Sequence, residues 1–234
     1  DFEKFKNIKT LLTIHNIGQQ GIFPKSSFSK TELPAKLNTP DGIIFKNKVN
    51  FLKAGLKYAD SISTVSESYS KEICDIDEIS NGLKEEINCR NKDLYGIVNG
   101  IDTLVWNPEK DKKIIKKFSI TSLGNKVKNK KELATKFGLE FKQEVPIIAM
   151  ISRLEDNKGL DLVKKAFKEI MSLDVQFVLL GTGDKKYHKF FEDAEMKYAD
   201  KFACYLGFDD DLAHLVEAGA DMFLMPSKYE PCGL

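Results

Sequence analysis

The second half of the chain alternates short apolar runs with longer amphipathic segments. The apolar runs lie at residues 147–151, 175–180, 202–206 and 222–225, and the amphipathic segments lie at 159–173, 185–199 and 211–219. Nearly continuous apolar runs are typical of buried parallel strands, whereas apolar residues at a spacing of about 3.6, as in 159–173, indicate a helix. We therefore predict a β-α-β-α-β-α-β unit with right-handed crossovers and an open parallel sheet covered on both faces.

The first hundred residues repeat this alternation less regularly. Apolar runs at 8–14, 61–65 and 94–98 predict strands, while 48–59 and the segment after Ser66 predict helices. Ser66 would cap its helix, because a serine hydroxyl accepts a hydrogen bond from an N–H of the first turn. Residues 24–46 hold three of the seven prolines with much Ser and Thr, which predicts a long loop with little regular structure.

A second polar stretch, residues 107–130, leads into the regular part. We expect the charges of its "KVKNKKE" string to form a solvated face. Two α/β units joined near Asn99 to Asp102 fit the pattern better than one, with domains at 1–98 and 99–234. The chain begins with Asp and ends just after a loop, so we expect it to be part of a longer protein.

Composition and charge exclude several classes of protein. Thirty-six Lys and Arg balance thirty-five Asp and Glu, so a net charge of +1 gives no bulk attraction to nucleic acid or to an anionic membrane. No window approaches the roughly 18 uncharged apolar residues of a membrane helix, and the start lacks a secretory pattern, so we expect a cytoplasmic protein. The four cysteines show no CxxC spacing, which disfavours a zinc site or a disulfide framework.

Polar residues and glycines follow the predicted strands of the second half. In an open parallel sheet, ligands bind beyond the carboxyl ends of the strands, which meet at one edge. Lys158 precedes a predicted helix, where a cation is disfavoured by about 0.3–1 kcal/mol unless an anion lies beside it. The planar fork of an arginine and the point charge of a lysine together suit a diphosphate. We expect this edge to carry six residues, Arg153, Lys158, Gly181, Gly183, Phe208 and Glu230.

Five of these six residues also have an interpretation that needs no ligand. Lys158 could pair with an acidic neighbour, Glu155, Asp156 or Asp161. The two glycines would serve any tight turn between a strand and a helix, because the GxGxxG spacing is absent. A phenylalanine is more often a core residue than a stacking platform, and a lone carboxylate in a loop is usually solvated.

His15 is a candidate outside this edge. It ends the first predicted strand and is followed by Asn16 and two nearby glycines, which permit close backbone approach. His188 and His214 lie on predicted helices and are interpreted as surface or packing residues. The chain has no GxSxG, HExxH or metal-spaced cluster, which argues against a nucleophilic hydrolase or a metalloenzyme.

Six strings in this order resemble the bacterial and plant glycogen and starch synthases, which are retaining glycosyltransferases. They are "TIHNIGQQGIFP", "NFLKAGLKYADSISTVSESYSKEI", "GIVNGIDTLVWNPEKD", "ISRLEDNKGLDL", "LLGTGD" and "GADMFLMPSKYEPCGL". The resemblance runs from residue 11 to the last residue, interrupted mainly by 24–46 and 112–144. It implies an α/β fold of the GT-B type, with two Rossmann-like domains that face a cleft, both incomplete in this chain. Residues 1–98 would belong to the acceptor-side domain and 99–234 to the nucleotide-sugar-binding domain.

The resemblance also implies a reaction and a set of site residues. Glucose would pass from ADP-glucose, or from UDP-glucose, to the non-reducing end of an α-1,4-glucan, with retention and without a metal, a cofactor or a covalent intermediate. Arg153 and Lys158 would bind the diphosphate and stabilise the charge that develops there. Glu230 would contact the glucose hydroxyls, and His15 would line the donor glucose from the opposite domain. Further substrate contacts are implied for six residues, Asn99, Gly181, Phe208, Cys232, Gly233 and Leu234.

The sequence departs from the family pattern in three respects. The family's lysine-glycine-glycine loop and the helices that follow "EPCGL" are absent, so we expect the four-stranded sheet to expose apolar surface. Phe208 stands where many members have tyrosine, which removes one hydroxyl contact but keeps the aromatic face. Two alternatives stay open: another nucleotide-sugar glycosyltransferase, of sucrose or trehalose type, and a non-catalytic glucan-binding scaffold. The missing GxGxxG disfavours a nicotinamide-dependent oxidoreductase.

Overall fold

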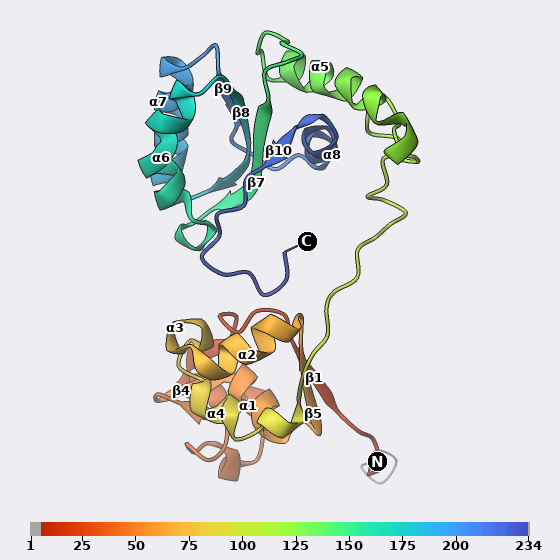
Figure 1. Ribbon diagram of the computed structural model, residues 1–234. Coiled ribbons are helices and arrows are strands. Elements are labelled where there is room, and N and C mark those ends of the chain that lie inside the picture. Colours follow the sequence, from red (N-terminus) through yellow and green to blue (C-terminus); the bar gives the residue numbers. More distant parts are fainter. Residues whose placement is uncertain (1–5, 234) are drawn as a thin grey trace. The chain divides into compact units, whose positions relative to one another are not determined.

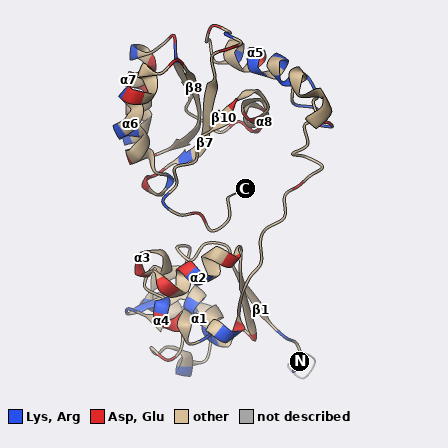
Figure 2. Ribbon diagram, in the orientation of Figure 1, with Lys and Arg blue, Asp and Glu red and all other residues tan. Residues whose placement is uncertain are grey.

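The computed structural model describes residues 6–233, and the chain divides into two compact units (Figure 1). The first unit comprises Asp1–Gly100 with Glu230–Leu234, and the second comprises Ile101–Tyr229. Basic and acidic residues are interspersed along the helices of both units, in keeping with the balanced charge (Figure 2). None of the helices between residues 6 and 233 is both long and apolar enough to cross a membrane.

A three-stranded parallel sheet forms the centre of the first unit. Its strands are β1 (Leu11–Ile14), β5 (Ser61–Thr64) and β6 (Leu94–Gly96), in the order β1-β5-β6. In the register, Ile14 lies opposite Thr64 and Thr64 opposite Gly96, so the three strands end at one level. The three predicted strands are confirmed, although each is shorter than its apolar run.

Four helices pack in the described part of this unit: α1 (Phe51–Tyr58), α2 (Glu67–Asp75), α3 (Asp77–Ser80) and α4 (Lys84–Asn88). The predicted cap is confirmed, because the Ser66 hydroxyl accepts a hydrogen bond of 3.0 Å from the N–H of Tyr69. The helix predicted over 48–59 begins only at Phe51, where the Asn50 side chain accepts from Lys53 N–H at 2.8 Å. Helices α3 and α4 were not predicted, because they are too short to show helical periodicity.

The prediction of a long irregular loop over 24–46 is wrong. Strands β2 (Ile22–Pro24), β3 (Ile44–Phe45) and β4 (Lys48–Asn50) form a small antiparallel sheet in the order β2-β4-β3, and two 3-10 helices, Lys25–Thr31 and Ala35–Leu37, lie between them. The segment is ordered by a buried cluster of apolar side chains, Phe28, Ile43, Ile44 and Val49. Strands of two or three residues carry no readable alternation, so the pattern favoured a loop.

The second unit is built on a four-stranded parallel sheet, as predicted. Its strands are β7 (Ile147–Leu154), β8 (Gln176–Gly183), β9 (Phe202–Tyr205) and β10 (Met222–Phe223), in the order β10-β7-β8-β9. The three predicted helices between them are confirmed as α6 (Leu160–Ser172), α7 (Lys185–Lys197) and α8 (Asp210–Gly219).

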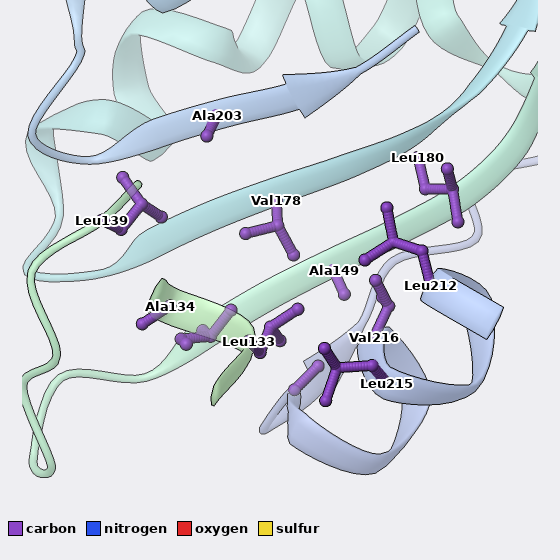
Figure 3. Close-up of a cluster of buried hydrophobic side chains, with 12 residues drawn as sticks. Leu133, Ala134, Leu139, Ala149, Val178, Leu180, Ala203, Leu212, Leu215 and Val216 are labelled. Carbon is purple, nitrogen blue, oxygen red and sulfur yellow. The ribbon is translucent and has the colours of Figure 1, made fainter. Parts of the chain in front are cut away.

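Helices cover both faces of this sheet (Figure 1), so the expected exposure of apolar surface is confirmed only at strand β10, where Met222 and Phe223 stay 45 % and 43 % exposed. Helices α6 and α7 pack on one face, where Phe167, Phe191 and Phe202 are buried. Helix α8 and the unpredicted helix α5 (Lys126–Lys136) pack on the other, where Leu133 of α5 and Val216 of α8 meet Val178 of β8 (Figure 3).

The expected solvated face of "KVKNKKE" is also wrong in part, because α5 buries two of these polar residues. Asn129 is fully buried, and its side chain accepts from Lys116 N–H at 2.9 Å and donates to Lys116 C=O at 2.7 Å. The Lys130 ammonium, on a residue that is 5 % exposed, lies 2.9 Å from an Asp221 carboxylate oxygen and donates to Gln143 C=O. These polar side chains can be buried because they form hydrogen bonds with backbone groups 13 residues away in the sequence. The local pattern of charges does not reveal such partners.

Candidate functional site

The carboxyl ends of the strands in the second unit form the expected edge. Strands β7 and β8 run side by side in parallel register, with Arg153 opposite Thr182 and Leu154 opposite Gly183. Arg153 is therefore the second-last residue of its strand, and Lys158 follows in the next turn. The prediction that both cations lie at one edge of this sheet is confirmed.

The Arg153 guanidinium is held beside Glu155. Its Nη1 atom lies 3.0 Å from Glu155 Oε1, and the arginine side chain is 60 % exposed. An ion pair this exposed contributes only about 0–1 kcal/mol. An anionic ligand with two or more oxygens could therefore recruit the guanidinium at little cost.

Lys158 ends a single 3-10 turn, Asp156–Lys158, that leads into α6. The next residue, Gly159, has a φ of 69°, and a Cβ atom built on it would lie 2.0 Å from the carbonyl oxygen of Pro226. The Lys228 N–H donates to Asn157 C=O at 2.9 Å in the same region. The loop after β7 and the loop after β10 are thus packed backbone against backbone, and this contact fixes the position of Lys158.

The acidic residues near Lys158 have other cationic partners. Asp156 accepts from the Lys186 ammonium at 2.6 Å and from the Tyr187 hydroxyl at 2.5 Å. These two hydrogen bonds lower the pKa of Asp156, and the same contact raises the pKa of Lys186. Asp161 lies 3.4 Å from the Lys228 ammonium. The edge is therefore a network of both charge signs, in which Asp156 is held in its anionic form.

Gly181 and Gly183 belong to strand β8, of which Gly183 is the last residue, and not to the predicted turn. A Cβ at Gly181 would lie 2.0 Å from Ser152 C=O, and one at Gly183 would lie 2.6 Å from Leu154 C=O. The Gly183 N–H donates to His188 Nε2 at 3.2 Å. The close approach of β7 accounts for both glycines without a ligand, although through packing between strands and not through a turn.

Phe208 lies in the loop between β9 and α8 and is 87 % exposed. The alternative that it is a core residue is wrong. An exposed aromatic ring close to the carboxyl end of β9, the edge strand, has a face on which a planar group can stack.

The candidates in the first unit gather at the equivalent edge of its own sheet. His15 directly follows β1 and is exposed, and Asn99 follows β6 by three residues and is half-buried. The loop after His15 is anchored, because Ile17 N–H donates at 3.1 Å to the hydroxyl of the fully buried Tyr69. This role of Tyr69 could not be predicted, because no local pattern in the sequence links residues so far apart.

The remaining candidates group with the first unit rather than with the second. Glu230 and Cys232 are half-buried and Gly233 is exposed, while Leu234 lies outside the described residues. The predicted set is thus divided, with His15, Asn99 and Glu230 in one unit and the two cations in the other. Gly159 was also missed, although a lone glycine just before a helical pattern is the signal that could have found it.

Two family descriptions match most of the chain. Residues 1–88 match the starch synthase catalytic domain, and residues 131–234 match the glycosyl transferases group 1 family. A glycogen synthase of Thermosipho africanus is 47% identical over 234 residues, which are 100% of this chain and 48% of that protein. A glycogen synthase of Bacillus cereus is 45% identical over 231 residues, covering 98% of this chain and 48% of that protein. The chain therefore spans about half the length of the curated relatives it matches.

Solved structures give the same assignment. The catalytic domain of starch synthase IV from Arabidopsis thaliana, bound to ADP and acarbose, aligns with a TM-score of 0.89 and 32% identity over 97% of this chain and 47% of that one. Anabaena HepE, in complex with UDP and glucose, aligns with a TM-score of 0.51 and 17% identity over 95% of this chain and 48% of that one, which supports the fold alone. Both are GT-B glycosyltransferases, so the predicted fold class is confirmed. From its fold and from its sequence along the whole length, the chain belongs to the glycogen and starch synthase family.

Proposed function

We propose that the protein is a glycogen or starch synthase that transfers glucose from ADP-glucose to the non-reducing end of an α-1,4-glucan, with retention of configuration. One observation carries the proposal: a chain similar to glycogen synthases throughout its length keeps an arginine and a lysine together at the carboxyl edge of a parallel sheet. The starch synthase IV structure supports this choice of donor, since it contains ADP.

The two cations would act on the diphosphate of the donor. Arg153 would exchange its exposed contact with Glu155 for phosphate oxygens, and Lys158 would add a second positive charge from the turn before α6. As the bond from the sugar to phosphate breaks, negative charge grows on the leaving diphosphate. Because the packing of two loops fixes the turn that carries Lys158 in advance, its charge would need little reorganisation, and such electrostatic stabilisation is usually what contributes most to catalysis.

The residues of the first unit would contact the sugar. We assign Glu230 to the glucose hydroxyls and to the positive charge at the reacting carbon, and His15 and Asn99 to the donor glucose. The bond from C1 to the phosphate oxygen breaks, a bond from C1 to the acceptor hydroxyl forms on the same face, and the departing phosphate takes the hydroxyl proton. This path retains the configuration at C1 with no covalent bond to the protein.

The two parts of the chain would then have separate tasks. Residues 1–98 would belong to the acceptor-side domain and 99–234 to the nucleotide-sugar-binding domain. Phe208 would lie against the base, and the backbone of Cys232, Gly233 and Leu234 would meet the glucose or the distal phosphate. We further infer that the enzyme acts in the cytoplasm, or in a plastid if its source is a plant.

The test measures incorporation of radiolabelled glucose into glycogen by the full-length protein, with ADP-glucose and UDP-glucose offered in parallel. We expect transfer from ADP-glucose, and a fall of about 100-fold in Lys158→Ala and in Glu230→Ala, as for the loss of one preorganised charged group. Lys168→Ala, an exposed lysine on α6, is the matched control and should retain full activity. Equal rates in all four proteins would remove the proposed roles, and transfer from UDP-glucose alone would change the assigned donor.

A further inference from the structure

The loop of residues 16–21 follows β1 and His15 in the first unit, and buried side chains from other parts of that unit hold it. At its start, the N–H of Ile17 donates to the hydroxyl of Tyr69 at 3.1 Å. Ile17 and Tyr69 are both fully buried, and Tyr69 belongs to helix α2. Loss of this hydroxyl would leave a buried N–H without its partner, which is unfavourable by about 1–3 kcal/mol. The bond therefore fixes the beginning of the loop on α2.

Gln20 fixes the other end of the loop. Its side chain is buried, and its oxygen accepts from the side-chain amide of Asn50 at 2.8 Å while its nitrogen donates to Asn81 C=O at 3.0 Å. Asn50 is buried as well and caps α1, and Asn81 follows α3. The Gln20 C=O accepts from Leu52 N–H at 3.0 Å. The side chain and the backbone of Gln20 are thus both bonded to residues outside the loop.

Asn16, the residue directly after His15, closes the loop between these two anchors. Its side-chain oxygen accepts from Gly18 N–H at 2.8 Å, and its C=O accepts from Gln19 N–H at 3.0 Å. Apolar side chains could fill the buried positions of the two anchors without the desolvation of polar groups. Buried polar groups whose hydrogen bonds are satisfied instead specify one conformation of the segment that they hold. Here they specify the course of the backbone directly after His15.

We propose that Tyr69 and Gln20 are positioning residues for glucose transfer, which hold His15 at the donor glucose through the loop of residues 16–21. The inference rests on the proposed function, from which it takes the contact between His15 and the sugar. Neither positioning residue touches the substrate, since both are buried. The two cations assigned to the diphosphate belong to the second unit. Tyr69 and Gln20 should therefore influence the rate of transfer and leave the affinity for ADP unchanged.

The test replaces Tyr69 by phenylalanine in the full-length protein, which keeps the buried ring and removes the hydroxyl alone. We expect kcat for transfer from ADP-glucose to glycogen to fall about 10-fold, because a small displacement of a sugar contact is costly in the transition state. The Kd for ADP, measured by isothermal titration calorimetry, should change by less than about 2-fold. Ser70→Ala is the matched control, because it also removes a hydroxyl from α2, but one that donates to Glu67 C=O within the helix. It should change neither quantity.

A second measurement separates positioning from a general loss of stability. In the His15→Ala background, Tyr69→Phe should lower kcat no further, because the contact through which it acts is already absent. A destabilised unit would lower kcat by the same factor in both backgrounds. If Tyr69→Phe does not fold, Gln20→Met takes its place, since it keeps the length of the side chain and removes the bonds to Asn50 and Asn81. The same results are expected of it.

Three results would overturn the proposal: an unchanged kcat in Tyr69→Phe, an equal fall in the His15→Ala background, or an affinity for ADP that weakens together with kcat. An unaltered protein that transfers no glucose from ADP-glucose would refute the proposed function, and this inference with it. An active unaltered protein whose variants behave alike would refute the positioning alone, so the two failures are distinguishable.

Discussion

Replacement of Gly159 by alanine tests whether the contact between the loops after β7 and β10 fixes the edge of the second sheet. At a φ of 69° an alanine is strained, because its Cβ approaches its own backbone, at a cost of about 1–2 kcal/mol. The new Cβ would also lie 2.0 Å from the Pro226 carbonyl oxygen and 2.8 Å from its carbon. An ordinary contact needs about 3.4 Å or more, so one of the two loops has to move by more than an ångström.

The structure provides a control that separates these two effects. Gly138, just after α5, has a φ of 70° but nothing within 4 Å of an added Cβ. Gly138→Ala should therefore show the backbone strain alone, about 1 kcal/mol for a glycine that follows a helix. Gly159→Ala adds the displacement of a packed loop, and we expect about 2–4 kcal/mol in total.

The assay is urea denaturation of the unaltered chain and both variants, followed by titration of each folded protein with ADP. Gly159→Ala should lower the free energy of unfolding by more than Gly138→Ala and should also weaken ADP binding, because Lys158 directly precedes it. Gly138→Ala should leave ADP binding unchanged. Equal losses of stability in the two variants would refute the reasoning, since the contact with Pro226 would then contribute nothing.

Three further predictions concern positions outside this edge. Hydrogen bonds from the backbone and side chain of Thr10, and one from Lys9, lower the pKa of Asp60 to about 2. The stabilising effect of the Asp60 carboxylate is therefore present above the unfolded pKa of 3.8 and is lost as the pH falls toward 2. Urea midpoints measured from pH 5 to pH 2 should fall less steeply in Asp60→Asn than in the unaltered chain. Asn129→Ala leaves the N–H and C=O of Lys116 without their buried partner and should cost about 2–4 kcal/mol in urea denaturation. Burial and neighbouring glutamates raise the pKa of Cys204 to about 12, so little of the reactive thiolate is present at pH 8. Iodoacetamide should therefore alkylate Cys204 at least about 10-fold more slowly in the folded chain than in urea, as measured by mass spectrometry.

The sequence predicted the second unit far better than the first. Four apolar runs and three amphipathic segments gave every strand of the larger sheet and α6, α7 and α8, because long elements repeat their period several times. Helix α5 was missed because its buried face includes Asn129 and Lys130, which a pattern of polarity assigns to solvent. The antiparallel sheet around residues 22–50 was missed because its strands have only two or three residues each.

The candidate site shows the same division between local and distant information. The placement of Arg153 and Lys158 followed from the rule that parallel strands end at one edge. Phe208 is exposed, and its role at that edge stays a prediction. The meaning of Gly181 could not be predicted, because its need for a small side chain comes from Ser152 on the neighbouring strand. The burial of His214 depends on a partner about a hundred positions away, which no local spacing reveals.

The short strand β10 has a practical consequence for work with this chain. It pairs with β7 on one side only, and between residues 6 and 233 no strand adjoins its other side. Met222, Phe223 and Met225, along this strand and just after it, are each between 43 % and 53 % exposed. An unpaired edge strand with exposed apolar side chains can pair with strands of other molecules, so concentrated samples should tend to aggregate through this edge of the sheet. A lysine in place of Met222 would be the simplest protection against such aggregation.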